Sequence, residues 1–352
     1  MLSLLYSYKR SEILSEEQPA KTVRISAPLD SQHSTPFTSL RSTDLFALSH
    51  LPGVHRTLTF SRYAGDMRWL LILVMIVMPF AGQSASGAKR ILVEGHRGAR
   101  WAMPENTLPA FHHAIEVGAD VLEMDTVVTK DNVLVVSHDA EMRPEICKGP
   151  EELPRVIREL TLAQVKQFDC GWAQNPGFPT QKAVPGTRMP TLEEVFRELA
   201  PLGKFEFNIE TKIHPAKPAL APAPEEFARL LVAEIRKFKL ESRVIVQSFD
   251  FRTLHAVKML APEIRRSALI GTGEASFLSV SKRAGDAPIV SPQLQLVTAE
   301  KVREAHAAGL KVVPWTANQP AELQALIDAD VDSIITDNPE GLIRYLAERN
   351  LH

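Results

Sequence analysis

Residues 93–139 of the chain read VEGHRGARWAMPENTLPAFHHAIEVGADVLEMDTVVTKDNVLVVSHD, and this stretch decides the fold. Short strand-like runs lie on either side of one helical run, and His, Arg and carboxylate side chains gather at the strands. Burying so many ionisable groups is costly unless they work together. We therefore expect both a strand-helix architecture and a functional site in this stretch.

The alternation of strand-like and helix-like runs continues from residue 91 to the end of the chain. The connections are too short for separate domains, which favours a parallel sheet covered by helices. About eight strand-helix units predict an α/β fold of the (β/α)8 or TIM-barrel type over residues 89–352. A doubly wound open sheet is the alternative, and the lack of a Gly-rich dinucleotide turn disfavours it.

One segment, residues 140–190, interrupts the alternation because it is rich in Pro and Gly. We interpret it as an inserted loop subdomain after the early strand that ends at His138, on the face where barrel enzymes bind substrates. The chain's two cysteines, Cys147 and Cys170, lie inside it. In an oxidising compartment they could form a disulfide, and two unpaired buried thiols are the alternative.

The N-terminal residues follow a different pattern. Residues 1–66 have no sustained periodicity, so we interpret them as a mis-annotated upstream extension or a disordered segment. Residues 67–88 combine Met67 and Arg68 with an uncharged apolar run and then small residues, which is typical of a signal peptide. The apolar run is shorter than the roughly 20 residues that span a bilayer.

This pattern predicts a periplasmic or secreted protein with no stable membrane span after cleavage, whose mature form begins between Gln83 and Lys89. An uncleaved anchor after a disordered tail is the alternative. The formal net charge of −2 gives no electrostatic reason to expect a nucleic acid or an anionic membrane as partner. Two cysteines are too few for a Cys-rich zinc site.

Three carboxylates are candidates for a metal site. Glu123 and Asp125 are two residues apart on a predicted strand, so their side chains point to the same face. Glu210 and Lys212 repeat this spacing on a later strand. A lone carboxylate at a strand edge is usually solvated or paired, but three that converge at a barrel mouth repel each other without a cation. Oxygen ligands favour Ca²⁺ or Mg²⁺.

Two histidines are candidates for proton transfer. His96 and His138 each end a predicted strand, which puts both at one rim of the barrel. Their ordinary pKa near neutrality suits an acid-base pair. Arg97 and Lys212 add fixed positive charge, so the pocket fits an anion whose charge rises during reaction. Phosphoryl transfer meets that description.

The motifs together resemble the glycerophosphodiester phosphodiesterase family, in its periplasmic bacterial form. The matching segments are HRGA at 96–99, PENT at 104–107, GADVLEMD at 118–125, SHD at 137–139, NIETK at 208–212, QSF at 247–249, PWTAN at 314–318 and ITDNP at 335–339. HRG alone would be a weak match, but the set is specific and covers residues 91–348.

The resemblance implies metal-dependent hydrolysis of a small glycerophosphodiester to sn-glycerol 3-phosphate and an alcohol, in glycerol and phospholipid scavenging. It assigns one Ca²⁺ or Mg²⁺ ion to Glu123, Asp125 and Glu210, acid-base catalysis to His96 and His138, and phosphate or substrate binding to Arg97, Lys212 and Trp315. It also implies that Glu105 helps to orient the site.

Three other functions are compatible with parts of this pattern. A phospholipase D-like enzyme acting on lysophospholipids would use the same chemistry, with the insertion contacting lipid. A barrel glycosidase also has paired carboxylates, but it needs neither the histidines nor a metal. A non-catalytic binding protein is disfavoured because the set of ligands and histidines is complete.

Overall fold

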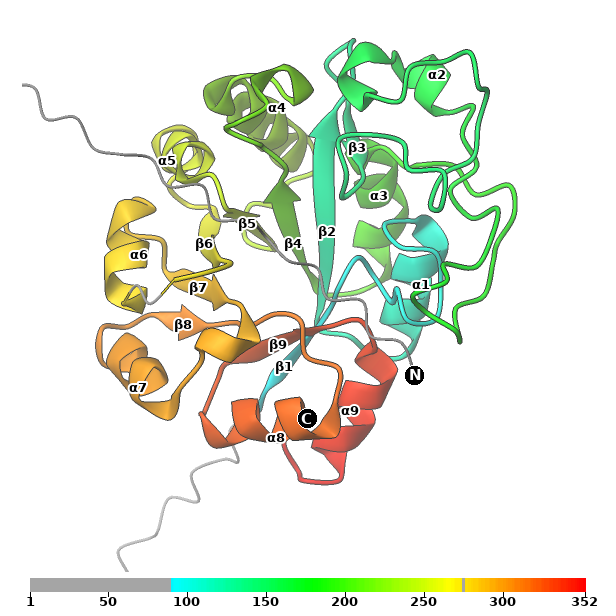
Figure 1. Cartoon of the computed structure of the whole chain (residues 1–352). Helices are drawn as coiled ribbons and strands as arrows, with labels where there is room; N and C mark the ends of the chain where they lie inside the picture. The colour runs from blue at the N-terminus through cyan, green and yellow to red at the C-terminus, as the bar shows by residue number, and fades with distance from the viewer. Residues whose placement is uncertain (1–89, 274–275) are drawn as a thin grey trace, which may run out of the picture. The chain divides into compact units, whose positions relative to one another are not determined.

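The computed structural model of the protein describes residues 90–273 and 276–352. The predicted extension 1–66 and signal peptide 67–88 lie outside the described residues. The described chain forms a nearly closed barrel of parallel strands with helices around it (Figure 1). The TIM-barrel prediction is confirmed, and the doubly wound alternative is excluded because the first and last strands pair. No helix in the described part is long and apolar enough to cross a bilayer.

The barrel strands follow the order β8-β7-β6-β5-β4-β2-β1-β9. They are β1 (Leu92–Gly95), β2 (Val121–Val128), β4 (Glu206–Thr211), β5 (Val244–Ser248), β6 (Arg265–Ile270), β7 (Ile289–Pro292), β8 (Lys311–Val312) and β9 (Ser333–Thr336). Two hydrogen bonds connect the β8 side to β9: Asp332 N–H donates to Val312 O at 3.0 Å, and Ile335 N–H donates to Pro314 O at 3.0 Å. They bring the two edges of the sheet together.

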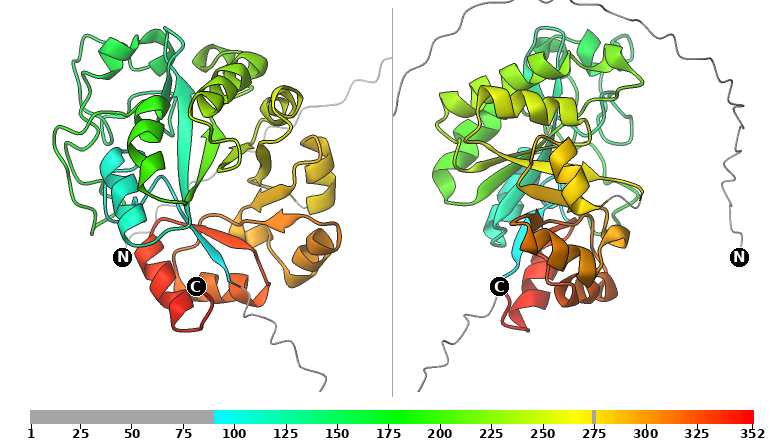
Figure 2. Two further views of the ribbon diagram at one scale, coloured as in Figure 1. Left: turned by 180° about the vertical axis from the view of Figure 1, so that it is seen from behind. Right: turned by 90° about the vertical axis from the view of Figure 1, so that its left-hand side faces the viewer.

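Helices cover the outside of the barrel, as the two views in Figure 2 show. They are α1 (Leu108–Glu116), α3 (Leu192–Leu199), α4 (Pro224–Lys237), α5 (Phe251–Leu260), α6 (Phe277–Arg283), α7 (Ala299–Ala307), α8 (Pro320–Asp328) and α9 (Pro339–Ala347). Polar residues fix where several of them begin. Thr191 and Glu194 form a capping box at α3, and the side chains of Asp250 and Thr298 cap α5 and α7.

The two-residue period of the strands separates the core from the site. On β2, Leu122 and Met124 point outward into the hydrophobic core under the helices, so Glu123 and Asp125 point into the barrel. A separate inner layer made of Ile245, Ile289, Val313 and Ile335 fills part of the barrel interior. The strand pattern thus delivers the carboxylates to the inside of the barrel.

One sequence prediction about strand direction is wrong. β3 (Leu134–Val136) is not a barrel strand, because it pairs antiparallel with the end of β2 as a hairpin. His138 therefore does not follow the carboxyl end of a parallel strand. It still reaches the site, because the hairpin turns back toward it, and Ser137 N–H donates to Asp125 O at 3.0 Å. The insertion follows this hairpin and ends before α3.

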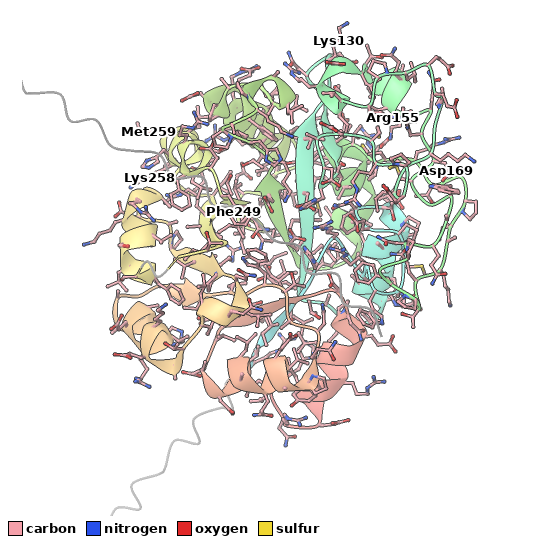
Figure 3. All side chains as sticks on the ribbon, viewed as in Figure 1. Lys130, Arg155, Asp169, Phe249, Lys258 and Met259 are labelled. Carbon is pink, nitrogen blue, oxygen red and sulfur yellow. A yellow bond between two sulfur atoms is a disulfide. The ribbon has the colours of Figure 1, made fainter. Side chains whose placement is uncertain are left out.

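The insertion has a small hydrophobic core of its own. The cluster includes Phe168 and the short helix α2 (Leu162–Val165), and it rests on Val127 of β2 and Val135 of β3. Cys147 and Cys170 form a disulfide within this cluster. Figure 3 labels Arg155 and Asp169 on this part of the molecule. The disulfide cross-links two parts of the insertion, and the contacts with Val127 and Val135 fix the insertion to the barrel beside β2.

Candidate active site

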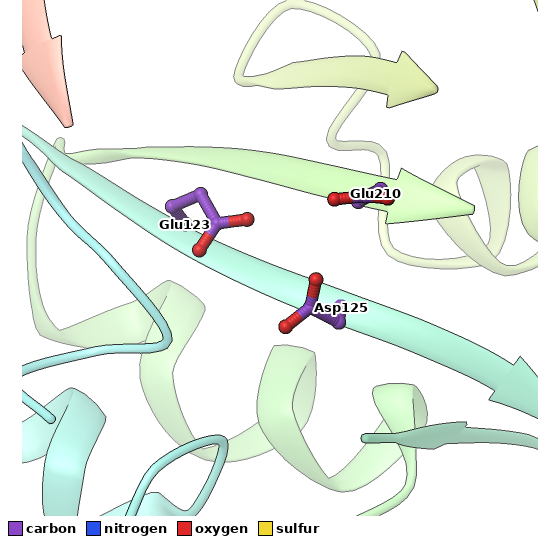
Figure 4. Close-up of side chains that lie close together, drawn as sticks. All are labelled: Glu123, Asp125 and Glu210. Atoms are coloured by element: carbon purple, nitrogen blue, oxygen red, sulfur yellow. The ribbon is translucent and has the colours of Figure 1, made fainter. Parts of the chain in front are cut away.

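Three buried carboxylates converge inside the barrel. Glu123 and Asp125 come from β2 and Glu210 from the neighbouring β4 (Figure 4). Asp125 and Glu210 are register partners across the two strands. Ligand atoms of all three lie within 4.8 Å of one another, and the exposed fractions are 2%, 1% and 6%. The structure thus brings together the residues that the sequence predicts as metal ligands.

Two positively charged side chains, Lys212 and Arg97, lie among these carboxylates, and they do not pair equally with all three. Lys212 Nζ lies 3.0 Å from Asp125 Oδ1 and 2.8 Å from Glu210 Oε1, while Arg97 Nε lies 3.4 Å from Asp125 Oδ2. Glu123 instead accepts hydrogen bonds from the Arg97 backbone N–H at 2.8 Å and from the Gln247 amide at 2.9 Å. Glu123 is therefore bound by neutral donors.

The pKa shifts follow this charge distribution. Burial, and then the charge of Asp125, raise the pKa of Glu123 well above its ordinary value. Burial opposes ionisation of Asp125, yet Lys212 and Arg97 hold its pKa well below the ordinary value. Burial also raises the pKa of Glu210, against the effect of Lys212. Neutral donors hold Glu123, and the ammonium of Lys212 pairs only with the other two carboxylates, so the three sets of oxygen ligands fit one divalent cation.

Arg97 is held by the loop between β1 and α1. Its φ of 51° lies in the left-handed region, which is uncommon for a residue other than Gly, and its Nη1 donates to Glu105 Oε1 at 2.6 Å. Gly98 follows with φ 85°, and a Cβ there would lie 2.7 Å from the Ala110 backbone of α1. In the HRG motif, Gly98 thus lets α1 pack closely against the loop, and Arg97 has its guanidinium held in place by Glu105.

His96 is mostly buried and has an acidic partner. Its Nδ1 lies 2.6 Å from Asp337 Oδ1, in the loop after β9, and Asp337 Oδ2 accepts from Asn318 Nδ2 at 2.7 Å. Burial lowers the pKa of His96, and Arg97 and Arg100 lower it further, while Asp337 opposes them. Because Nδ1 is engaged, Nε2 is the ring nitrogen left for proton transfer.

His138 also lies close to the carboxylates. Its side chain is 34% exposed, and its Nδ1 lies 3.1 Å from Asp139 Oδ1. It is near enough for a positive charge on its ring to contribute to the lowered pKa of Asp125 and to oppose the effect of burial on the pKa of Glu210. A pocket beside His138 is lined by Glu105 and by parts of the insertion, including both cysteines. The insertion therefore forms one wall next to this histidine.

Trp315 lies in the loop after β8. It packs on the inner hydrophobic layer, and its Nε1 donates to Ser291 O at 2.8 Å. The ring of Phe249, which is 45% exposed after β5, meets it edge-on at 5.6 Å. These two rings give the carboxyl end of the barrel an apolar surface.

The structure adds residues to which the sequence assigned no role. Asn106 has φ 56°, its Nδ2 donates to Asp125 Oδ2 at 2.8 Å, and its Oδ1 accepts from Asp125 N–H at 3.2 Å. Asp337 and Gln247 hold His96 and Glu123 as described above. All three belong to motifs named in the sequence analysis: Asn106 to PENT, Asp337 to ITDNP and Gln247 to QSF. The motifs pointed to these segments, but the partners of the three side chains could be seen only in the structure.

Comparisons with known proteins agree with this geometry. The model of the glycerophosphoryl diester phosphodiesterase family matches residues 96–341. The chain is 35% identical over 257 residues to a glycerophosphodiester phosphodiesterase of Caldanaerobacter subterraneus subsp. tengcongensis, covering 73% of this chain and 98% of that protein. A Bacillus subtilis enzyme of the same name is 31% identical over 291 residues, covering 76% and 92%.

The crystal structure of a putative glycerophosphoryl diester phosphodiesterase from Silicibacter pomeroyi is similar in fold. It superposes with a TM-score of 0.69 at 30% identity, over 75% of this chain and 95% of that one. Both the sequence and the barrel thus match across nearly the whole length of these relatives.

Proposed function

The chain belongs to the glycerophosphoryl diester phosphodiesterase family, and we propose that it hydrolyses small glycerophosphodiesters to sn-glycerol 3-phosphate and an alcohol. The observation that carries the proposal is the buried cluster of Glu123, Asp125 and Glu210, with Lys212 bound to two of the three carboxylates. Such a site holds a cation and a phosphodiester together.

We propose that Glu123, Asp125 and Glu210 hold one Ca²⁺ or Mg²⁺ ion. A divalent cation there would supply Lewis-acid stabilisation of the charge on the phosphoryl oxygens. Arg97 and Lys212 supply positive charge that their carboxylate partners hold in place, which orients the anionic substrate.

His96 and His138 are the proposed proton-transfer groups. One takes a proton from the nucleophile, either the glycerol 2-hydroxyl or water, and the other gives a proton to the departing alcohol oxygen. The lowered pKa of His96 keeps its ring neutral near pH 7, which favours proton acceptance at Nε2. Trp315 and Phe249 provide an apolar surface for the carbon skeleton of the substrate.

The proposed location is outside the cytoplasm. Two observations support it: the signal-peptide pattern of residues 67–88, and the disulfide between Cys147 and Cys170, since disulfides persist in oxidising compartments. There the enzyme would scavenge glycerol phosphate from phospholipid breakdown products. N-terminal sequencing of exported protein tests the further proposal that residues 1–66 are an upstream extension and that the mature chain begins between Gln83 and Lys89; a mature chain that retains residues before Met67 would contradict it.

Product analysis tests the activity. Purified protein is incubated with glycerophosphocholine, glycerophosphoethanolamine and a lysophospholipid, each with a divalent cation and with a chelator. The proposal requires sn-glycerol 3-phosphate from the first two substrates and none in the chelator. Preferential cleavage of the lysophospholipid would favour the phospholipase D-like alternative. No phosphodiesterase activity, with chelator-insensitive cleavage of glycosides, would favour the glycosidase.

A further inference from the structure

The insertion contacts the loop between β1 and α1 immediately after the HRG motif. Three hydrogen bonds, at 2.7 to 3.2 Å, run from residues 180–182 to the carbonyl oxygens of residues 100–102. The ring of Trp101 also meets the ring of Phe178 edge-on at 5.9 Å. This part of the insertion is therefore docked on the segment that carries Arg97 and Arg100.

Phe178 bears directly on Arg100. The guanidinium carbon of Arg100 lies 4.4 Å from the centroid of the Phe178 ring. Phe178 is only 9% exposed. A guanidinium over an aromatic face that is shielded from water is attracted by the negative charge of the ring face. The contact thus fixes the orientation of the Arg100 side chain.

The other side of Arg100 faces the partner of His96. Arg100 Nε lies 3.5 Å from Asp337 Oδ1 and 3.4 Å from Glu105 Oε2. This Asp337 oxygen is also the atom that binds His96 Nδ1 at 2.6 Å. Arg100 Nε is buried and forms no hydrogen bond with any described residue, so its effect on Asp337 is mainly one of charge.

We propose that Arg100 is a positioning residue for His96, held by Phe178 of the insertion and acting through Asp337. The proposal rests on the proposed function, in which His96 transfers a proton. It gives the insertion a role beyond lining the pocket beside His138: through Phe178 and Arg100 the insertion helps to set the ionisation and orientation of His96.

The charges around His96 give the sign of the expected effect. Burial lowers the pKa of His96, as do Arg97 in its own loop and Arg100, whereas Asp337 from the β9 side raises it. Asn318, from the loop after β8, holds the second Asp337 oxygen and carries no charge. Loss of the Arg100 charge should therefore raise the pKa of His96.

The test is a histidine titration followed by NMR on the full chain, in buffer containing Ca²⁺. His96 is assigned with a His96→Gln variant. In Arg100→Gln the midpoint of the His96 titration should rise by about 0.5 or more. Arg100→Lys keeps the charge, so it should restore most of the midpoint. Phe178→Leu keeps apolar volume but removes the ring face, and it should shift the midpoint in the same direction by less.

Arg155→Lys is the matched control. Arg155 also lies over a phenylalanine of the insertion, with its guanidinium carbon 5.8 Å from the Phe168 centroid, and it takes no part in the interactions around Asp337. This variant should leave the His96 midpoint unchanged. If Arg155→Lys shifts the midpoint as much as Arg100→Gln does, the effect is a general loosening of the insertion and the proposal is overturned.

Kinetics supply the second measurement. In Arg100→Gln, kcat should fall by about tenfold or more with a smaller change in KM, and the acidic limb of the pH profile should move to higher pH with the NMR midpoint. A His96 midpoint equal to that of the wild type in both Arg100→Gln and Phe178→Leu overturns the proposal. The NMR titration does not depend on catalytic activity. If the wild type is inactive but the His96 midpoint still shifts as predicted in Arg100→Gln, only the proposed function is rejected.

Discussion

Asp125 and Glu210 lie opposite each other on β2 and β4, although the whole insertion separates them in the sequence. The Lys212 ammonium connects their carboxylates, at 3.0 Å and 2.8 Å. Glu123, two residues before Asp125, completes the cluster without a cation of its own. The cation site therefore exists only when the barrel brings β2 and β4 together, so cation binding should be coupled to folding.

The first prediction concerns this coupling. A cation that binds only the native state at about 100 times its Kd should raise the free energy of unfolding by about 2.7 kcal/mol. Thermal unfolding with increasing Ca²⁺ or Mg²⁺ measures it. Glu210→Gln should lose most of this stabilisation and about 100-fold or more of the activity. Glu263→Gln, at an exposed ion pair with Arg236, is the control. An undiminished cation effect in Glu210→Gln would reject the ligand assignment.

The second prediction concerns the two histidines. His96→Asn and His138→Asn should each lower kcat by about 10²–10⁴-fold, because each removes one proton-transfer group. Steady-state kinetics on glycerophosphocholine measure the change, and circular dichroism checks the fold. His112→Asn provides the comparison, since His112 lies on the surface and pairs with Glu198. Near-normal turnover in either site variant is incompatible with acid-base catalysis by that residue.

Local sequence patterns were sufficient to predict the barrel and the carboxylate cluster. Glu123 and Asp125 share a face because strand side chains have a period of two, and that rule holds in any strand. Parallel strands in a barrel then bring their inward residues together, which made Glu210 predictable as a neighbour. These inferences needed only periodicity and the order of elements.

Other features depend on pairing that the sequence pattern does not encode. β3 has the apolar run of a barrel strand, but its direction is set by the hairpin with β2, which the pattern alone could not reveal. Asp337 becomes the partner of His96 only because β9 pairs with β1, where Thr336 is the register partner of Gly95. Arg100 likewise depends on Phe178, which the insertion brings from a distant segment.

The third prediction concerns the insertion. Thiol titration of the denatured protein without reductant should detect no free thiol, because Cys147 and Cys170 are bonded to each other. Replacing both by Ser should lower the free energy of unfolding by about 3 kcal/mol on the chain-entropy model, for a sequence separation of 23. Urea denaturation measures this, and wild type in reductant is the control. Two reactive thiols would exclude the bond.

The last prediction concerns Glu94, inside the barrel on β1. It is 2% exposed, and its Oε2 accepts from Asn208 Nδ2 at 2.8 Å. Burial raises its pKa from 4.5 to about 7, so the native state binds this proton more tightly than the unfolded chain does. The stability that Glu94 contributes is thus fully present below about pH 4.5 and is lost as pH rises through about 7.

Glu94→Gln isolates this effect because Gln stays neutral and keeps an oxygen acceptor for Asn208. The free energy of unfolding of the variant, relative to wild type, should increase by about 3 kcal/mol between about pH 4.5 and about pH 8. Urea denaturation at the two pH values, at one cation concentration, measures the difference. Glu263→Gln, whose carboxylate is exposed, should show no comparable increase. A constant difference for Glu94→Gln would mean that the carboxyl group ionises as readily inside the barrel as in the unfolded chain.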